Sequence, residues 1–434
     1  MTQNAATISD TAHPAYKWYL LAILVLIYIF GAVDRGVISV VAEPIKNAFN
    51  LSDAQLGALG GLAYSLPYAI LVLPMGWLVD RVNRRVLLSS TVSIWSMCTA
   101  LSAFSGSYLS LIAARVGVGA AEAPASPASL SLIADTFPEN QRSTAVGIYY
   151  SGAALGQFVI FVLGGWVLLE FGWREVFLVA GVPGIILAAL LFFTTREPVR
   201  GMFDASRQKL VEVSQGGLDA PSLKTAIARI FLEPGLRNAL LANTFSTGVQ
   251  FSLMIWLVSF LVRIHGVSVA ESAIWIGVGV GVSQSVGSLC VGPIADRFSR
   301  GDPSKLVLIP AFGTAGALVA GVVMTLATNF WFMISGLVAV GFLAGIFVAT
   351  GYSLILSLAA PNLRGTTLAS GKLLSVLIGG GIIPFLTGLV SDLFGGDQSL
   401  RPAMLLTVAL YGVATFFFVN SRRSILRAER KALN

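Results

Sequence analysis

The chain has 434 residues, of which 56% are hydrophobic and 11% charged, and its net charge is +7 at pH 7. This composition is far more apolar than that of an average globular protein, so it indicates a polytopic membrane protein. The positive charge does not indicate a nucleic-acid partner, because the basic residues lie in short gaps between apolar runs.

Residue patterns that build metal centres, disulfides or nucleotide sites are missing from the sequence. Cys98 and Cys290 each lie inside an apolar run and His13 and His265 are isolated, which excludes a disulfide framework, a thiolate metal site and an HExxH motif. The glycine run at 277–281 has no strand before it, and no Gly-Lys-Ser/Thr loop is present. We therefore expect no cofactor, no use of ATP and no enzymatic activity.

Twelve apolar runs are long enough to cross a bilayer, which takes about 20 helical residues. They cover 18–42, 52–79, 86–106, 108–135, 141–170, 174–195, 236–264, 270–296, 304–327, 329–358, 362–393 and 399–421. The sequence thus predicts an all-α integral membrane protein with a six-helix half at 1–195, a linker at 196–235 and a second six-helix half at 236–434. The first run has no small-residue cleavage site, so we expect it to be retained as a span.

Basic residues predict the orientation of these spans. Most of the 28 Lys and Arg residues lie in segments on the same side as the N-terminus. The opposite segments and the span interiors together hold only Lys46, Arg174, Arg263, Arg401, Arg35, Arg115 and Lys372. Because cytoplasmic loops are enriched in Lys and Arg, we predict that both termini are cytoplasmic.

One loop motif occurs twice. GWLVDRVNRR at 76–85 follows the second span, and GPIADRFSR at 292–300 follows the eighth, so the halves are related by duplication. Parallel repeats about an axis along the membrane normal are expected from this arrangement. The first copy resembles the signature loop between helices two and three of the major facilitator superfamily, and the chain is similar to that superfamily over nearly its whole length.

Within the superfamily, the sequence resembles the spinster group. The likeness rests on Asp34-Arg35 in the first span, NRR at 83–85, RVGVGAAEA at 115–123 and REP at 196–198. It implies a proton-coupled, alternating-access transporter of a lysolipid or sphingosine-phosphate-like substrate. We expect it to act as a monomer among the lipids of a bacterial inner membrane. Organic-anion symporters share the Asp-Arg pair and a motif that GAAEAPASP at 119–127 fits, so proton-coupled symport of sugar acids is the alternative.

Three charged residues inside spans predict the proton pathway. Asp34 and Arg115 lie about 12 Å and about 10 Å below the external ends of their helices, so we predict an inter-helix pair between them. Glu122 lies about two turns deeper on the same face as Arg115, without an obvious local cation. Burial favours the protonated form of a carboxyl group, so we predict Glu122 and Asp34 as proton-coupling residues. The alternatives are that Asp34 and Arg115 form a static clamp between their helices, and that Glu122 stays protonated as a hydrogen-bond donor in the packing.

Substrate binding is predicted from the remaining buried polar groups. Arg35 suits an anionic group, because guanidinium binds carboxylate or phosphate bidentately and keeps its charge. Away from the ends of the predicted spans, Lys372 is the only charged residue in a span of the second half, and it lies about 15 Å from the cytoplasmic end. The predicted substrate-binding residues are Arg35, Arg115, Lys372, Asn243, Gln250 and Tyr352.

The repeated loop predicts a cytoplasmic gate. Positive-inside topology explains the arginines, but it leaves the acid repeated at positions 80 and 296 unexplained. In relatives with this loop, the acid contacts helix eleven and nearby arginines, and here Arg142 is available to pair with Asp80. The predicted gate residues are Gly76, Asp80, Arg81, Arg85, Arg142, Asp296 and Arg297.

Overall fold

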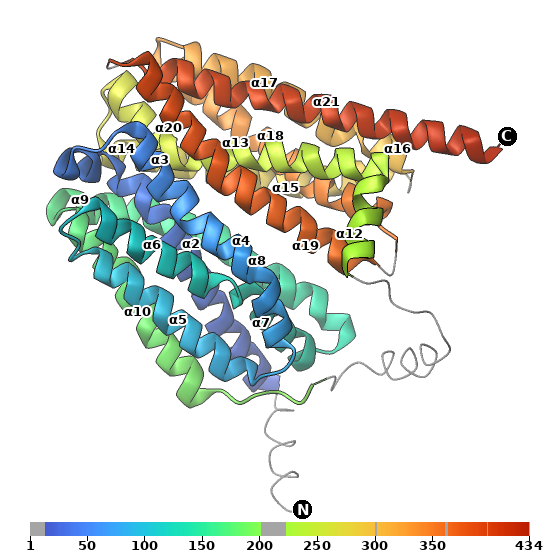
Figure 1. Ribbon diagram of the computed structural model, residues 1–434, viewed down its shortest axis with the longest axis horizontal. Helices are drawn as coiled ribbons and strands as arrows, with labels where there is room; N and C mark the ends of the chain where they lie inside the picture. Colours follow the sequence, from blue (N-terminus) through green and yellow to red (C-terminus); the bar gives the residue numbers. More distant parts are fainter. Residues whose placement is uncertain (1–13, 201–222, 300–301, 361–362, 397, 434) are drawn as a thin grey trace, which may run out of the picture. The chain divides into compact units, whose positions relative to one another are not determined.

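The computed structural model of the chain describes residues 14–200, 223–299, 302–360, 363–396 and 398–433 (Figure 1). All regular elements in these ranges are helices, which confirms the predicted all-α fold class. Ten helical runs among the described residues are long and apolar enough to cross a membrane. Helices suit a bilayer because their backbone N–H and C=O groups are bonded within the segment.

The two remaining predicted spans coincide with less apolar helices. α5 (Arg84–Ser102) covers the third span and contains several serines that donate to the carbonyl one turn earlier. The fourth span is divided into α6 (Tyr108–Glu122) and α7 (Ala125–Thr136). The break falls at Ala123 and Pro124, because proline lacks the N–H that the helix needs. Each predicted span therefore corresponds to one helix or to two or three consecutive helical segments.

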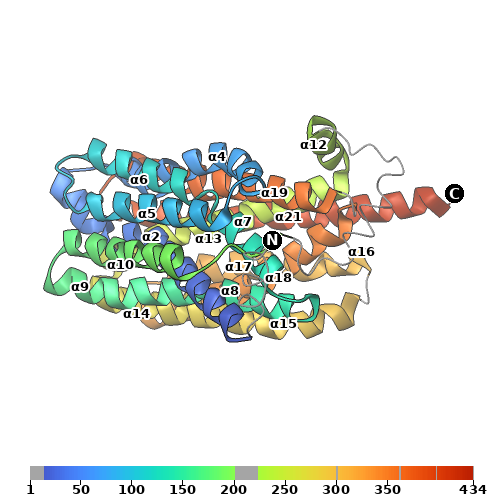
Figure 2. The same cartoon turned by 90° about the horizontal axis from the view of Figure 1, so that it is seen from below.

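The described chain forms two compact units, and the first comprises the described residues of 1–37 and 67–220. Its helices are α2 (Pro14–Phe49) up to residue 37, α4 (Ala63–Val79) from residue 67, α5, α6, α7, α8 (Glu139–Val159), η2 (Ile160–Gly164), α9 (Gly165–Glu170) and α10 (Trp173–Thr194). α5 packs along α10 and α6 (Figures 1 and 2). Asn83 caps α5, and Ser107 with Ser110 forms a capping box at α6, so both helix starts are fixed locally.

The second unit comprises the described residues of 38–66 and 221–434. Beyond residue 66 its helices are α12 (Leu223–Leu232), α13 (Pro234–His265), α14 (Val269–Ile276), η3 (Gly277–Val282), α15 (Ser283–Ser299), α16 (Pro303–Leu306), α17 (Leu308–Leu326), α18 (Phe330–Leu358), α19 (Arg364–Leu374), η5 (Ser375–Ile382), α20 (Ile383–Phe394) and α21 (Leu400–Leu433). α13 packs against α18, α20, α21 and η5. Its Trp256 is fully buried and donates from Nε1 to the Pro384 carbonyl at 3.0 Å, which fixes α13 to α20.

Residues 38–66, here called the outer hairpin, belong to the second unit although they precede its other helices by more than 150 residues of sequence. They comprise the end of α2, α3 (Asp53–Gly57), η1 (Ala58–Leu62) and the first turn of α4. Ser39 donates to the Met254 carbonyl at 2.6 Å, and a Cβ atom on Gly61 would lie 2.8 Å from the Gly381 carbonyl oxygen. The division into a half at 1–195, a linker at 196–235 and a half at 236–434 stays a prediction. Residues 201–222 of that linker lie outside the described residues.

Four short π-helical segments interrupt the α-helices of the described chain: η1, η2, η3 and η5. They fall in the second, fifth, eighth and eleventh predicted spans, which are the middle spans of each consecutive set of three. A π-helical turn closes its hydrogen bonds over five residues and is found frequently at functional sites. Among the described residues, a π-helical segment therefore recurs once in every three predicted spans.

Candidate functional site

The first unit contains a buried ion pair between α2 and α6. Arg115 Nη1 lies 3.3 Å from Asp34 Oδ1, and the two side chains are 1% and 2% exposed. Thr99 of α5 also lies against this carboxylate, with its Oγ1 at 2.6 Å from Asp34 Oδ1. The structure confirms the predicted pairing of Asp34 with Arg115. The contribution of Thr99 was not predicted, because serines and threonines are common in α5 and nothing in the sequence distinguishes this one.

A second ion pair joins the same two helices. Arg35 Nη1 contacts Glu122 Oε1, and the side chains are 24% and 6% exposed. This corrects the prediction that Glu122 has no local cation. Depth counted along the helix axes omits the direction of the side chain. Side chains of a helix tilt toward its N-terminus, so Arg35 reaches from the level of Asp34 toward Glu122.

Both carboxylates are only partly satisfied. Asp34 Oδ2 and Glu122 Oε2 are buried and accept no hydrogen bond from the described residues. A Cβ atom on Gly31, one turn before Arg35, would lie 3.1 Å from Glu122 Oε1, so glycine leaves room for this carboxylate. An unsatisfied buried oxygen is costly while the carboxyl group is charged, and protonation of the group lowers that cost.

A cluster of tyrosines begins beside Arg35. The Arg35 guanidinium carbon lies 5.9 Å from the Tyr28 ring centroid. The Tyr28 ring lies 4.4 Å from that of Tyr149 and 5.8 Å from that of Tyr150, both on α8. The sequence analysis did not select Tyr28, although it lies about two turns before Arg35 and therefore on the same face of α2. Arg35 therefore lies beside one ring of a three-tyrosine cluster.

The predicted binding residues of the second half lie in the second unit, on α13, α18 and α19. Asn243 is 1% exposed, and its Oδ1 and the Nε2 of Gln250 have no hydrogen-bond partner among the described residues. A Cβ atom on Gly351, next to Tyr352, would lie 3.2 Å from Asn243 Oδ1. Lys372 is exposed in the last turn of α19. The assembly of these residues with Arg35 and Arg115 into one cavity stays a prediction.

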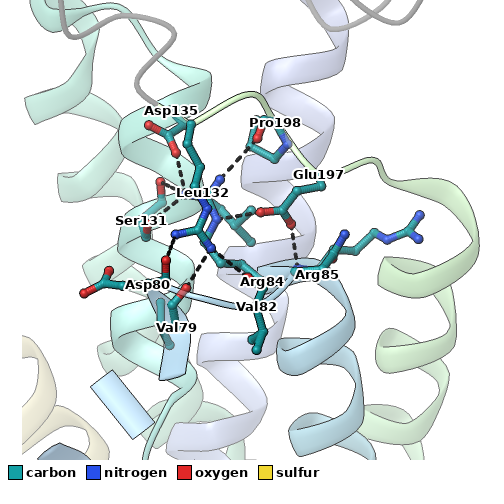
Figure 3. A network of polar contacts seen from close by, with 12 residues as sticks. Val79, Asp80, Val82, Arg84, Arg85, Ser131, Leu132, Asp135, Glu197 and Pro198 are labelled. Atoms are coloured by element: carbon teal, nitrogen blue, oxygen red, sulfur yellow. Dashed lines mark hydrogen bonds and ion pairs between the residues drawn. The ribbon is translucent and has the colours of Figure 1, made fainter. Parts of the chain in front are cut away.

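The first unit holds a polar network around Arg84, here called the Arg84 cluster (Figure 3). Arg84 is 1% exposed, pairs with Asp135 of α7, and donates from Nε to Glu197 Oε1 at 2.7 Å. It also donates from Nη1 to Ser131 Oγ at 2.7 Å and from Nη2 to the Pro198 carbonyl at 3.2 Å. Arg84 therefore joins α5, α7 and the segment after α10, although the sequence analysis did not place it among the gate residues.

Other contacts extend this network to the loop before α5. Arg200 donates to the carbonyls of Val79 at 2.9 Å and Val82 at 2.7 Å, and also contacts that of Asp80. Arg85 donates to the Thr195 carbonyl at 2.8 Å. The Arg200 contacts satisfy carbonyls at the end of α4 and in the loop after it, and the Arg85 contact satisfies the carbonyl that ends α10.

The structure gives the two residues of the predicted Asp80–Arg142 pair other contacts. Asp80 is exposed and takes part through its backbone carbonyl, while Arg142 donates to the Ala134 carbonyl at 2.8 Å. Arg81 stacks on Trp77, with its guanidinium carbon 3.8 Å from the ring centroid. Among the other predicted gate residues, no heavy atom lies within 4 Å of a Cβ placed on Gly76, Arg297 is exposed, and the side chain of Asp296 lies outside the described residues.

At the predicted external side, the second unit holds a denser network around Asp53, here called the Asp53 cluster. The Asp53 side chain is 3% exposed and accepts from Arg263 Nη1 at 2.9 Å and 2.8 Å through its two oxygens. It also contacts Lys46, and Arg263 donates from Nε to Glu43 Oε1 at 2.8 Å. The sequence analysis placed Lys46 and Arg263 on the external side without assigning them a role.

The Asp53 cluster continues onto α20. Ser391 donates to Asp53 Oδ2 at 2.6 Å. The Asp392 carboxylate accepts from the backbone N–H groups of Asp53 at 2.8 Å and Ala54 at 2.7 Å, where it complements the N-terminus of α3. The cluster therefore fixes the outer hairpin to α13 and α20 within the second unit.

The comparisons with known proteins agree with this helical architecture. Residues 24–384 match the family model of the Major Facilitator Superfamily. The chain belongs to this superfamily. It is therefore an integral membrane transporter of small molecules and not an enzyme. Among the described residues, no group of His, Cys, Asp and Glu side chains is suited to hold a metal ion.

Individual relatives cover nearly the whole chain. The structure of a bacterial homologue of the human lysosomal transporter Spinster, inward-facing and unoccupied, matches with a TM-score of 0.85 and 28% identity over 96% of this chain and 98% of that one. This confirms the predicted resemblance to the spinster group. An MFS-type efflux pump of Mycolicibacterium smegmatis is 27% identical over 97% of both chains. A D-galactonate transporter of Escherichia coli is 28% identical over 94% of this chain and 97% of the relative.

Proposed function

We propose that the protein is a proton-coupled transporter of a small organic anion of the sugar-acid class, working by alternating access. The observation that carries this proposal is the Arg35–Glu122 pair, in which a partly exposed guanidinium has a buried carboxylate as its ion-pair partner. The relative that transports D-galactonate supports the sugar-acid class over the lysolipid that the spinster resemblance implied.

Competition for Arg35 links substrate binding to proton binding. A substrate carboxylate that takes the Nη1 donor of Arg35 displaces Glu122 from it, because Nη1 is the nitrogen that contacts Glu122 Oε1. Glu122 then remains as a buried carboxylate without a cation, and burial favours its protonated form. Substrate and proton therefore favour each other's binding, which is the linkage that symport requires.

The tyrosines around Arg35 support a ring-shaped or hydroxylated substrate. The Tyr28 ring lies beside the Arg35 guanidinium, and Tyr150 packs against Tyr28. Aromatic faces of this kind pack against the apolar C–H surface of a sugar acid. In the second unit, Asn243 Oδ1 and Gln250 Nε2 are buried without a hydrogen-bond partner among the described residues, which supports a substrate that carries hydroxyl groups. We place the protein, as a monomer, in a bacterial inner membrane with both termini cytoplasmic.

Uptake into proteoliposomes tests the proposal. An inward proton gradient is expected to drive accumulation of labelled D-galactonate, and Glu122→Gln is expected to abolish this accumulation while substrate exchange without a gradient continues. Arg35→Ala is expected to abolish both, because it removes the anion partner. Glu170→Gln, an exposed carboxylate at the end of α9, is the matched control and should behave as the unmodified protein.

Three results would contradict the proposal. Gradient-driven accumulation that survives Glu122→Gln would exclude this residue as the proton site. In competition binding, a labelled lysophosphatidate that is displaced by unlabelled lysophosphatidate but not by galactonate or a hexuronate would favour the lysolipid substrate. Uptake that does not respond to pH at all would exclude proton coupling.

A further inference from the structure

The hydroxyl group of Thr99 has two acceptors and one hydrogen. Thr99 is 1% exposed on α5, and its Oγ1 lies 2.6 Å from Asp34 Oδ1 and 3.0 Å from the carbonyl of Trp95. A threonine hydroxyl donates one hydrogen bond and can accept others. Both contacts can therefore be hydrogen bonds at the same time only if Asp34 supplies a hydrogen of its own.

We infer that Thr99 is a positioning residue that lets Asp34 take up and release a proton in place, an inference that rests on the proton coupling proposed above. When Asp34 is ionised, the Thr99 hydroxyl donates to Oδ1, and the Trp95 carbonyl keeps the backbone N–H bond of the helix. When a proton binds Oδ1, the carboxyl group donates to Thr99 Oγ1. The Thr99 hydrogen then turns to the Trp95 carbonyl, and no heavy atom has to move.

Arg115 can accommodate both states as well. Its Nη1 lies 3.3 Å from Asp34 Oδ1 and 3.5 Å from the backbone carbonyl of Asp34. After a proton binds Oδ1, this backbone carbonyl remains as an acceptor for the guanidinium. Protonation of Asp34 therefore weakens the Asp34–Arg115 ion pair between α2 and α6, while the guanidinium keeps a hydrogen-bond acceptor.

The groups around Asp34 define what else can influence its protonation. Arg115 of α6 is the ion-pair partner of Asp34, and the adjacent Arg35 contacts Glu122. Cys98 of α5 lies within electrostatic range of Asp34. Against the next turn of α2, η2 presents the apolar side chain of Ile160. Thr99 is thus the one neutral hydroxyl among the described groups that hydrogen-bonds this carboxylate.

The pH dependence of transport tests the role of Thr99. Thr99→Val keeps the shape of the side chain and removes the hydroxyl. A charge-assisted hydrogen bond to the carboxylate is lost, so we expect the midpoint of the pH profile of galactonate exchange to rise by about one pH unit. Thr99→Ser restores the hydroxyl and should restore the midpoint. Thr91→Val is the matched control, because Thr91 is buried on the same helix and donates only to the Leu88 carbonyl.

Infrared difference spectroscopy separates this inference from the proposed function. The carboxyl C=O band that Asp34→Asn removes should titrate at a higher pH in Thr99→Val, whether or not galactonate is the substrate. The inference would be overturned if this carboxyl band had the same frequency and the same midpoint pH in Thr99→Val as in the unmodified protein. An equal shift in Thr91→Val, or a shift in Thr99→Ser as large as that in Thr99→Val, would also overturn it.

Discussion

Two buried carboxylate sites of this protein differ in how completely they are bonded. In the Asp53 cluster, both oxygens of the carboxylate accept hydrogen bonds, from Arg263, Lys46 and Ser391. At Asp34 and Glu122, one oxygen of each carboxylate is bonded and the other has no partner among the described residues. Complete bonding keeps a carboxylate ionised and holds helices together, whereas incomplete bonding leaves a place for a proton.

The same change of one carboxylate to an amide should therefore change the free energy of unfolding by very different amounts at the two sites. The largest effect is expected for Asp53→Asn, which leaves Lys46 and Arg263 with one anionic partner fewer in a buried network. Breaking such a network typically costs about 3 to 5 kcal/mol. The free energy of unfolding of the detergent-solubilised protein, or its melting temperature, measures this loss. Glu271→Gln, an exposed carboxylate on α14, is the control. Melting of Asp53→Asn at the unmodified temperature would refute the structural role of the Asp53 cluster.

A smaller loss is expected for Arg84→Lys. Arg84 donates from Nε, Nη1 and Nη2 to different partners, and a lysine ammonium cannot reproduce this planar geometry. Two or more hydrogen bonds are lost while the charge remains, so we expect about 2 kcal/mol of destabilisation. Thermal melting compares it with Arg81→Lys, which changes an exposed arginine that donates to its own helix. Equal melting temperatures for the two variants would show that the Arg84 cluster does not need guanidinium geometry.

The smallest change in stability is expected for Glu122→Gln. This substitution removes a charge whose second oxygen is unsatisfied, and it leaves Arg35 partly exposed to solvent. Its effect should stay within about 1 kcal/mol, because losing the ion pair is offset by losing the cost of a buried charge. A melting temperature lowered as far as that of Asp53→Asn would mean that the two sites do not differ in kind.

The sequence was sufficient for features that depend on one segment or on depth in the membrane. Apolar run lengths predicted the helices, and equal depth predicted the Asp34–Arg115 pair. Depth alone could not predict the Arg35–Glu122 pair, since it ignores the direction in which the Arg35 side chain leaves its helix.

The Asp53 cluster was beyond reach for another reason. Asp53 and Asp392 are more than 330 residues apart in the sequence, and each lies at the end of a predicted span. Neither belongs to a motif that the sequence analysis identified. Their contact depends on which helices of the bundle are neighbours. Periodicity and charge do not encode that information in a single sequence. The Arg84 cluster was missed in the same way, because Glu197 comes from the segment after the sixth span.

The π-helical segments change the phase of the helices that contain them. A π turn holds roughly one residue more than an α turn, so residues beyond it are rotated by roughly 100° relative to a continuous α-helix. On the eleventh span, η5 separates Lys372 from Ser391 and Asp392. A helical wheel drawn over 362–393 therefore assigns the wrong neighbours to one end or the other. A helical wheel of this protein should therefore be drawn separately for the α-helix on each side of η1, η2, η3 and η5.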